Sequence, residues 1–237
     1  MILITGGSGK LGKELVKVLP GALAPKRADL DITEREAVSN FIKIHKPDKI
    51  IHCAALASVR QCETDKELAF KTNVKGTENL VDACLNFNPN CYFIYMSTAC
   101  IFYGDRGDYV ETDVPYPKNF YSLTKLLGEF VVKKLQTHLI IRTNFVERTK
   151  WPYEKAFADR FGTYLFADDL ALAIKDTISK KLVGIVHVVG EEKLSMFDLA
   201  KITSPDVKPM TMDEADLPLT KDMSLRSIRI KPYKLTR

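Results

Sequence analysis

Short apolar runs alternate with helical patterns along the first three-quarters of the 237 residues. Buried strands are expected at residues 1–7, 49–53, 91–97, 139–143 and 185–189, and helices at residues 10–20, 33–47, 65–87, 121–135 and 168–180. Thr33 is the expected N-cap of the second helix. Several strand candidates are apolar throughout, as is typical when helices cover both faces of a sheet. The alternation predicts an α/β fold with a Rossmann-like, doubly wound parallel sheet.

Two segments depart from this alternation. Residues 145–165, "FVERTKWPYEKAFADRFGTYL", hold the only tryptophan, and residues 190–237 carry four prolines and one clear helical stretch, "SMFDLAKI". We expect them to form a small substrate-binding lobe over the carboxyl ends of the strands, where ligands bind in such sheets. The predicted NAD(P)-binding domain then comprises residues 1–144 and 166–189.

A glycine-rich turn, "GGSGKLG", directly follows the first strand and opens the first helix. It places Gly6, Gly9 and Gly12 at G-x-x-G-x-x-G spacing. Glycines permit a tight turn and a close approach of backbone N–H groups to a pyrophosphate, and the helix N-terminus adds partial positive charge. An ordinary strand–helix turn is the alternative. The spacing differs from G-x-G-x-x-G and indicates another nucleotide-binding family.

A second cofactor signal is "APKRADLDIT", which follows a region where a further strand is expected. A carboxylate there would bind a ribose 2′-hydroxyl, whereas a basic residue accommodates a 2′-phosphate. Lys26 and Arg27 come first, and Asp29 and Asp31 follow. This order favours NADPH and leaves NADH open, with a solvated loop of alternating charge as the alternative.

The segment "NFYSLTKLLGE" places Tyr121 and Lys125 four residues apart at a helix start, so both side chains share one face. An ammonium near a phenol favours the phenolate, which lets the tyrosine donate and recover a proton near neutral pH. The pair comes about 20 residues after a strand that ends in Ser97 and Thr98.

Composition limits the partners. The net charge of +5 arises from 35 basic and 30 acidic residues spread along the chain, which suits an anionic small ligand better than nucleic acid. The five cysteines lack C-x-x-C or zinc spacing, and the four histidines lack ligand spacing, so we expect reduced thiols, a cytoplasmic protein and no metal site. No apolar run approaches the roughly 20 residues that span a bilayer, and the first strand at Met1 leaves no room for a targeting segment.

Taken together, these motifs resemble the extended short-chain dehydrogenase/reductase family. The family order is matched by "TGGSGKLG", "HCAA", "NVKGTENL", the Ser/Thr strand end and Y-x-x-x-K. The dTDP-4-dehydrorhamnose reductase branch is the nearest likeness, through "DLDIT", "PDKIIHCAA", "GDRGDYVETDVPYPKNFYSLTKLLGE" and "IIRT". The resemblance covers residues 1–190. It implies bound NADPH or NADH and a nucleotide-sugar substrate.

The resemblance also implies roles for individual residues. Tyr121 is the acid/base, Lys125 its pKa-lowering and ribose-binding partner, and Thr98 the hydroxyl that polarises the substrate carbonyl, with Ser97 as the alternative. The implied cofactor-binding residues are Gly6, Gly9, Lys10, Leu11, Gly12, Lys26, Arg27, Asp31, Ile32, Ala54, Ala55, Tyr121 and Lys125. Reduction of a 4-keto-6-deoxy sugar at C4 would follow.

One departure from the reductase pattern concerns Cys100. The rhamnose reductases place an Asp-Tyr pair after the threonine, whereas this chain has Ala99 and Cys100. A cysteine at this position resembles the bifunctional 3,5-epimerase/4-reductases, in which it exchanges protons beside the ketone with a His or Lys partner. Lys155, or alternatively Lys150, falls where that partner would lie. A buried strand-end thiol is the competing interpretation.

Further alternatives stay open. Arg142 and Arg160 are candidates to meet a diphosphate, with surface ion pairing as the other interpretation. Competing functions are a non-catalytic nucleotide-binding subunit and a nucleotide-sugar epimerase or dehydratase. The lobe is shorter than is usual in the family, and a homodimer formed by helix pairing is the expected assembly if the lobe relies on a partner subunit.

Overall fold

The computed structural model describes residues 1–237 and is built on one parallel sheet. The five strands lie in the order β1-β2-β3-β4-β9 and are all parallel. Their bounds are β1 (Ile2–Thr5), β2 (Lys49–His52), β3 (Tyr92–Met96), β4 (His138–Arg142) and β9 (Gly184–His187). The predicted doubly wound α/β fold is confirmed.

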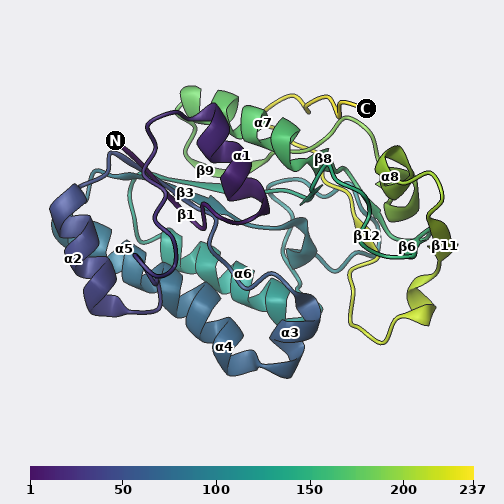
Figure 1. Cartoon of the computed structure of the whole chain (residues 1–237), viewed down its shortest axis with the longest axis horizontal. Coiled ribbons are helices and arrows are strands. Elements are labelled where there is room, and N and C mark those ends of the chain that lie inside the picture. Colours follow the sequence, from purple (N-terminus) through teal and green to yellow (C-terminus); the bar gives the residue numbers. More distant parts are fainter.

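Helices cover both faces of this sheet (Figure 1). One face carries α1 (Lys10–Val18) and α7 (Ala167–Ser179), and the other carries α2 (Arg35–His45), α5 (Gly76–Phe87) and α6 (Phe120–Val132). Successive strand residues point to opposite faces. Ile4 and Ile94 therefore belong to the core beneath α1 and α7, whereas Leu3 and Phe93 belong to the core beneath the other helices. Burial on both faces explains the continuous apolar runs.

The chain changes direction around β1. After α1 it returns on one side of β1, where Leu23 pairs with Leu3 in an isolated parallel bridge. After α2 it returns on the other side of β1 as β2. The expected further strand before "APKRADLDIT" is thus reduced to a single bridge, because Pro25 follows and residues 27–29 form a turn. The carboxyl end of β1 is a topological switch point, where α/β sheets bind ligands.

Two helix predictions need correction in detail. The second helix begins at Arg35 rather than at a Thr33 cap, because the Thr33 hydroxyl and N–H both donate to Asp31. The single helix expected over residues 65–87 consists of α4 (Lys66–Phe70), a π-helical turn (Lys71–Lys75) and α5, with Asp65 accepting a bond from Leu68 N–H at 2.9 Å. A short helix that was not expected, α3 (Val59–Thr64), precedes them.

Short strands and one helix form the region at the right of Figure 1, beyond the carboxyl edge of the sheet. Three small sheets are present, β10-β7-β12, β11-β6 and β5-β8. Their elements are β5 (Phe145–Val146), β6 (Lys155–Phe157), β7 (Phe161–Gly162), β8 (Leu165–Phe166), β10 (Leu194–Ser195), α8 (Met196–Thr203), β11 (Lys208–Met210) and β12 (Asp222–Met223). The expected helix "SMFDLAKI" is α8.

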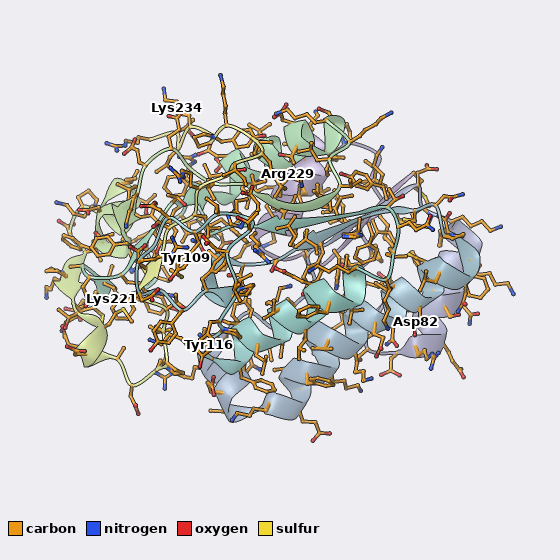
Figure 2. All side chains as sticks on the ribbon, turned by 180° about the vertical axis from the view of Figure 1, so that it is seen from behind. Asp82, Tyr109, Tyr116, Lys221, Arg229 and Lys234 are labelled. Carbon is orange, nitrogen blue, oxygen red and sulfur yellow. The ribbon has the colours of Figure 1, made fainter.

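The last residues return from this region to the main sheet. Arg229 donates to the Val183 and Ile185 carbonyls at 2.8 and 2.6 Å, and Tyr233 bonds with Thr177 on α7. Figure 2, which views the molecule from behind, places Arg229 near the upper helices and Tyr109 and Lys221 toward the small sheets. The division into two structural units stays a prediction. No helix combines the length and the apolar character needed to cross a bilayer.

Candidate active site

The glycine turn after β1 is closely packed. Gly6 has a φ of +71°, and a Cβ atom there would lie 2.7 Å from the Ala54 backbone nitrogen. A Cβ atom on Gly12 would lie 2.1 Å from the Gly6 carbonyl oxygen, so only glycine lets α1 approach the turn this closely. Gly9 precedes α1 as its N-cap and donates its N–H to the Gly6 carbonyl at 2.9 Å. No side chain forms a capping hydrogen bond at the N-terminus of α1, so this helix end is available to an anion.

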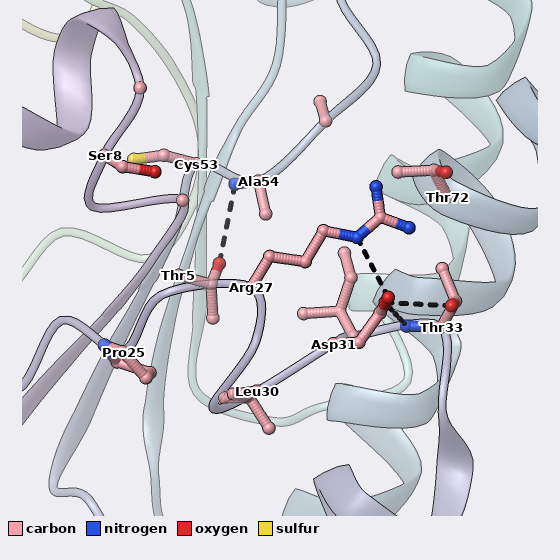
Figure 3. Close-up of a pocket in the computed structure, with 14 residues that line it drawn as sticks. Thr5, Ser8, Pro25, Arg27, Leu30, Asp31, Thr33, Cys53, Ala54 and Thr72 are labelled. Carbon is pink, nitrogen blue, oxygen red and sulfur yellow. Dashed lines mark hydrogen bonds and ion pairs between the residues drawn. The ribbon is translucent and has the colours of Figure 1, made fainter.

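A pocket of about 260 Å³ opens beside this turn (Figure 3). Of the predicted cofactor residues, it brings together Gly6, Gly9, Arg27, Asp31, Ile32, Ala54 and Ala55. The Arg27 side chain extends across it, and its Nε donates to Asp31 at 2.9 Å. Asp31 also accepts two bonds from Thr33, and these bonds, opposed by burial, hold the pKa of Asp31 below its usual value. A carboxylate bound in this way leaves the exposed guanidinium as the charged group that faces an incoming ligand.

Besides Tyr121 and Lys125, four predicted cofactor residues do not line this pocket. Leu11 is buried in the core beneath α7, and Gly12 packs against the turn. Lys26 is exposed and does not line the pocket. Lys10 lines a second, larger cavity and pairs with Glu147 at 3.3 Å.

This second cavity, of about 900 Å³, lies at the carboxyl end of β3 and β4. Thr98, Cys100, Tyr121 and Lys155 all line it. Thr98 lies just past β3 and accepts a bond from Cys100 N–H at 3.2 Å, and Tyr121 stands in the first turn of α6, whose cap is Asn119. The structure therefore brings the predicted hydroxyl and the predicted acid/base to one surface.

The Tyr121 phenol is desolvated although the side chain is partly exposed. Burial raises its pKa well above the usual range, the nearby Cys100 adds to the rise, and a hydrogen bond with Thr98 opposes it. Lys125 is not among the groups that shift this pKa. The predicted pKa-lowering role of Lys125 is thus not reproduced by the charges around Tyr121, and the phenol is protonated at neutral pH.

Lys125 belongs to the same helix, and its side chain is buried. Its Nζ lies 4.1 Å from the centroid of the Tyr95 ring, and it makes no hydrogen bond within the protein. Burial lowers its pKa to about 8, while Cys53 and Glu129 act in the opposite direction. A buried ammonium without an acceptor fits a ligand that offers hydroxyl or carbonyl oxygens.

A buried polar network, which the sequence did not reveal, joins the first strands to α6. His52 bonds with Thr5 at 2.6 Å and with Thr77 at 3.0 Å, and Thr77 donates to the Asn73 carbonyl. The Asn73 amide in turn donates to Thr124, and Thr124 to the Tyr121 carbonyl at 2.7 Å. The π-helical turn places Asn73 for these bonds. The only signal in the sequence was that "HCAA" and "NVKGTENL" match the family.

Arg142 does not reach the cavity. Its guanidinium donates to Glu129 at 3.0 and 2.8 Å, and both side chains are almost fully buried. The hydroxyl of Ser97 donates to the same carboxylate at 2.6 Å. The suggestion that Arg142 meets a diphosphate is therefore wrong, and Ser97, with its proton engaged, is a poor substitute for Thr98. Removing one partner of such a buried pair typically costs roughly 3–5 kcal/mol.

Cys100 and Lys155 line the same cavity without contacting each other. The Cys100 thiol lies 3.1 Å from the Met223 sulfur and is buried. The Lys155 Nζ pairs with Glu214 at 2.9 Å, and its side chain is 46% exposed. The alternative, Lys150, does not line the cavity.

Comparison with known proteins agrees with this geometry. The family model described as RmlD substrate binding domain matches residues 1–222. A dTDP-4-dehydrorhamnose reductase of Aggregatibacter actinomycetemcomitans is 30% identical over 84% of this chain and 76% of its own length. The crystal structure of the Bacillus anthracis dTDP-4-dehydrorhamnose reductase in complex with NADP superposes with a TM-score of 0.86 at 28% identity, covering 95% of this chain and 89% of that one. The rat methionine adenosyltransferase 2 subunit beta is 25% identical over 89% of this chain and 75% of its length.

Proposed function

Because the chain belongs to the RmlD substrate binding domain family, we propose that it is an NADPH-dependent reductase of a nucleotide-linked 4-keto-6-deoxy sugar. The observation that carries this proposal is the joint placement of Thr98 and Tyr121 on one cavity wall, with Lys125 beneath the same helix. A protein that only bound nucleotides would not need a desolvated, protonated phenol in that position.

Residues of the cavity polarise the ketone and supply the proton that the reduction consumes. The Thr98 hydroxyl donates a hydrogen bond to the substrate ketone and polarises it. Bound NADPH supplies the hydride. The Tyr121 phenol, held protonated by burial, gives its proton to the oxygen that becomes the new hydroxyl. The Thr98 hydroxyl then stabilises the phenolate by a hydrogen bond until the phenolate recovers a proton from solvent.

The chain offers groups of the chemistry that NADPH needs. The turn at Gly6 and Gly9 would receive the pyrophosphate, Arg27 in the smaller pocket would meet the 2′-phosphate, and Lys125 would donate to ribose hydroxyls. What supports the preference for NADPH is that Asp31 is already occupied by Arg27 and Thr33.

The direct test is the loss of NADPH absorbance with dTDP-4-keto-6-deoxy sugars that have been epimerised beforehand. Turnover with the wild type, and none with Tyr121→Phe, supports the proposal. Tight NADPH binding without oxidation by any 4-keto sugar would contradict it.

A non-catalytic nucleotide-binding subunit is the second candidate. The observation that favours it is the similarity to the methionine adenosyltransferase 2 subunit beta over most of the chain. The same absorbance assay separates the two functions, since the second predicts NADPH binding without turnover.

An added 3,5-epimerase activity is proposed on the position of Cys100 alone. Its thiol lines the cavity close enough to Tyr121 to affect the pKa of the phenol. As a thiolate it would remove a proton from the carbon beside the ketone, and a second group, the Lys155 ammonium, would deliver a proton to the opposite face of that carbon. Lys155 would have to leave Glu214 to assist. Turnover in heavy water tests this, since deuterium at C3 or C5 must appear with wild type and disappear with Cys100→Ser.

Two further proposals concern the surroundings of the protein. The five cysteines form no disulfide, which supports a reducing compartment such as the cytoplasm. Phe130 on α6 and Leu85 on α5 are exposed by 57% and 41%, which supports a homodimer formed through these helices. Sedimentation of wild type and Phe130→Glu tests the dimer.

A further inference from the structure

One buried cation of the large cavity has no counter-ion. Arg160 is only 9% exposed, lines the cavity and forms no ion pair. Its Nε donates to the Thr220 carbonyl at 3.0 Å, whereas its two terminal nitrogens contact only the sulfurs of Met196 and Met223, at 4.0 and 3.2 Å. Thioether sulfur is a weak acceptor, so most of the hydrogen-bonding capacity of this guanidinium is unused. Burying such a charge is costly unless an anion completes it.

An unpartnered phenol lies beside this guanidinium. Tyr164 is 2% exposed and lines the same cavity, and its hydroxyl has no hydrogen-bond partner. The Tyr164 ring packs directly against Gly162, where a Cβ atom would lie only 2.7 Å from the ring. Burial raises the pKa of the Tyr164 phenol, Arg160 opposes the rise, and Cys100 and Asp222 add to it. A buried hydroxyl without a partner, next to a cation without a counter-ion, indicates that a ligand supplies the missing acceptor.

The position of Arg160 relative to the reaction centre indicates which part of the substrate it meets. The Met223 sulfur contacts both the Cys100 thiol, at 3.1 Å, and Arg160 Nη2, at 3.2 Å, and Cys100 lines the cavity together with Tyr121. Arg160 therefore lies in the same cavity as the proposed reaction centre. A 6-deoxy sugar is uncharged, so the anionic group of a nucleotide sugar nearest to the reacting ring is the phosphate attached to that ring.

We propose that Arg160 and Tyr164 form an oxyanion subsite for the sugar-linked phosphate of a nucleoside-diphosphate sugar. The proposal rests on the function proposed above and assigns the residues that hold the charged part of that substrate. Arg160 supplies charge-assisted bonds from its terminal nitrogens, and Tyr164 supplies one neutral bond. The other cations that line the cavity are less suited, because Lys10 and Lys155 already pair with Glu147 and Glu214 and Arg60 is exposed to solvent.

The test is calorimetric titration of the full chain, saturated with NADPH, with dTDP, UDP, GDP and inorganic pyrophosphate, and with thymidine as the uncharged comparison. Arg160→Gln should weaken nucleoside-diphosphate binding by about 10- to 100-fold and leave thymidine and NADPH binding unchanged. Tyr164→Phe should weaken it by roughly 3- to 10-fold. Arg226→Gln removes an exposed guanidinium from the same segment as β12 and should change nothing.

Arg160→Lys is the control in case the glutamine variant misfolds. It keeps the buried charge and should retain part of the affinity for nucleoside diphosphates. Equal diphosphate affinity in wild type and both Arg160 variants, or no binding of any diphosphate to wild type, overturns the subsite. A sugar carboxylate is the other source of an oxyanion. If Arg160→Gln weakens UDP-glucuronate but leaves UDP-glucose unchanged, the carboxylate is the ligand and the phosphate assignment is wrong.

The two proposals fail separately. Diphosphate binding that depends on Arg160, without NADPH oxidation by any 4-keto sugar, leaves the subsite standing and removes the reductase. Turnover in the wild type with unchanged diphosphate affinity in Arg160→Gln leaves the reductase and removes the subsite.

Discussion

Tyr121 is the one side chain whose loss should stop the proposed chemistry without disturbing the fold. The phenol is desolvated and protonated, and its ring carbon framework is kept in Tyr121→Phe. A general acid typically contributes about 10²–10⁴-fold to the rate, so kcat should fall by that factor. NADPH affinity, measured by fluorescence titration, should change little. A phenylalanine variant that keeps most of its kcat would show that another group delivers the proton.

Lys125 should set the alkaline limit of activity. Its pKa is lowered to about 8 by burial, so the ammonium charge is present below that pH and is lost above it. Because the ammonium binds ribose in the proposed reaction, kcat/KM should decline as pH rises through about 8. Lys125→Arg keeps its charge at every accessible pH and should lose this decline even if its activity is lower throughout. A profile with the same alkaline limb in both proteins would assign the limb to another group.

Local motifs in the sequence were sufficient to single out Tyr121 and Lys125, but not to predict the pKa shifts of these two side chains. Y-x-x-x-K and a Ser/Thr strand end place Tyr121 and Thr98 at one sheet edge, because the carboxyl ends of parallel strands meet there. Long-range partners decide the rest. The sequence made Arg142 a ligand candidate, but in the structure it forms a buried ion pair with Glu129 of α6. Arg160 has no carboxylate partner, and its Nε donates to a backbone carbonyl.

In the proposed function, the glycine turn and α1 act as one unit in cofactor binding. Gly12→Ala would place a methyl group 2.1 Å from the Gly6 carbonyl oxygen, and backbone atoms cannot give way as a flexible side chain can. The helix must therefore move away from the turn, which should weaken NADPH binding at least 10-fold while the sheet stays folded. Lys13→Ala, on the exposed face of the same helix, is the matched control. Unchanged NADPH affinity in Gly12→Ala, measured by calorimetry, would mean that the turn does not receive the pyrophosphate.

Periodicity predicted the main strands and helices but missed features that depend on side chains competing for backbone groups. Thr33 looks like a helix cap, yet its hydroxyl is taken by Asp31, and α2 starts two residues later. The π-helical turn within residues 65–87 leaves the apolar pattern almost unchanged, although it is what directs Asn73 toward Leu56 and Thr124. The lobe has strands of two or three residues, which are too short for any periodic signal.

The whole molecule depends on neutral histidines buried at the edge of the sheet. Burial lowers the pKa of His187 to about 4 and that of His52 to about 3. His187 has Glu111 nearby, which opposes the shift, and Arg142, which adds to it. Its Nδ1 lies 3.1 Å from both the Tyr109 and the Arg226 carbonyl, so that nitrogen carries the proton of the neutral ring. Protonating Nε2 would place a charge where no acceptor exists.

The free energy of unfolding should therefore fall as the pH drops below about 6.5. The unfolded chain binds a proton at each histidine near pH 6.5, whereas the folded protein resists it down to about pH 4 at His187. The histidine contribution is thus complete above pH 6.5 and is lost progressively as pH falls toward 4, by an amount on the order of a few kcal/mol for each ring. Urea unfolding between pH 7.5 and 4.5 measures this loss. His187→Asn keeps a donor toward the two carbonyls and should flatten the dependence, whereas His45→Asn, at an exposed position, should not. An equal pH dependence in wild type and His187→Asn would mean that His187 is charged in the folded protein, with Glu111 outweighing its burial.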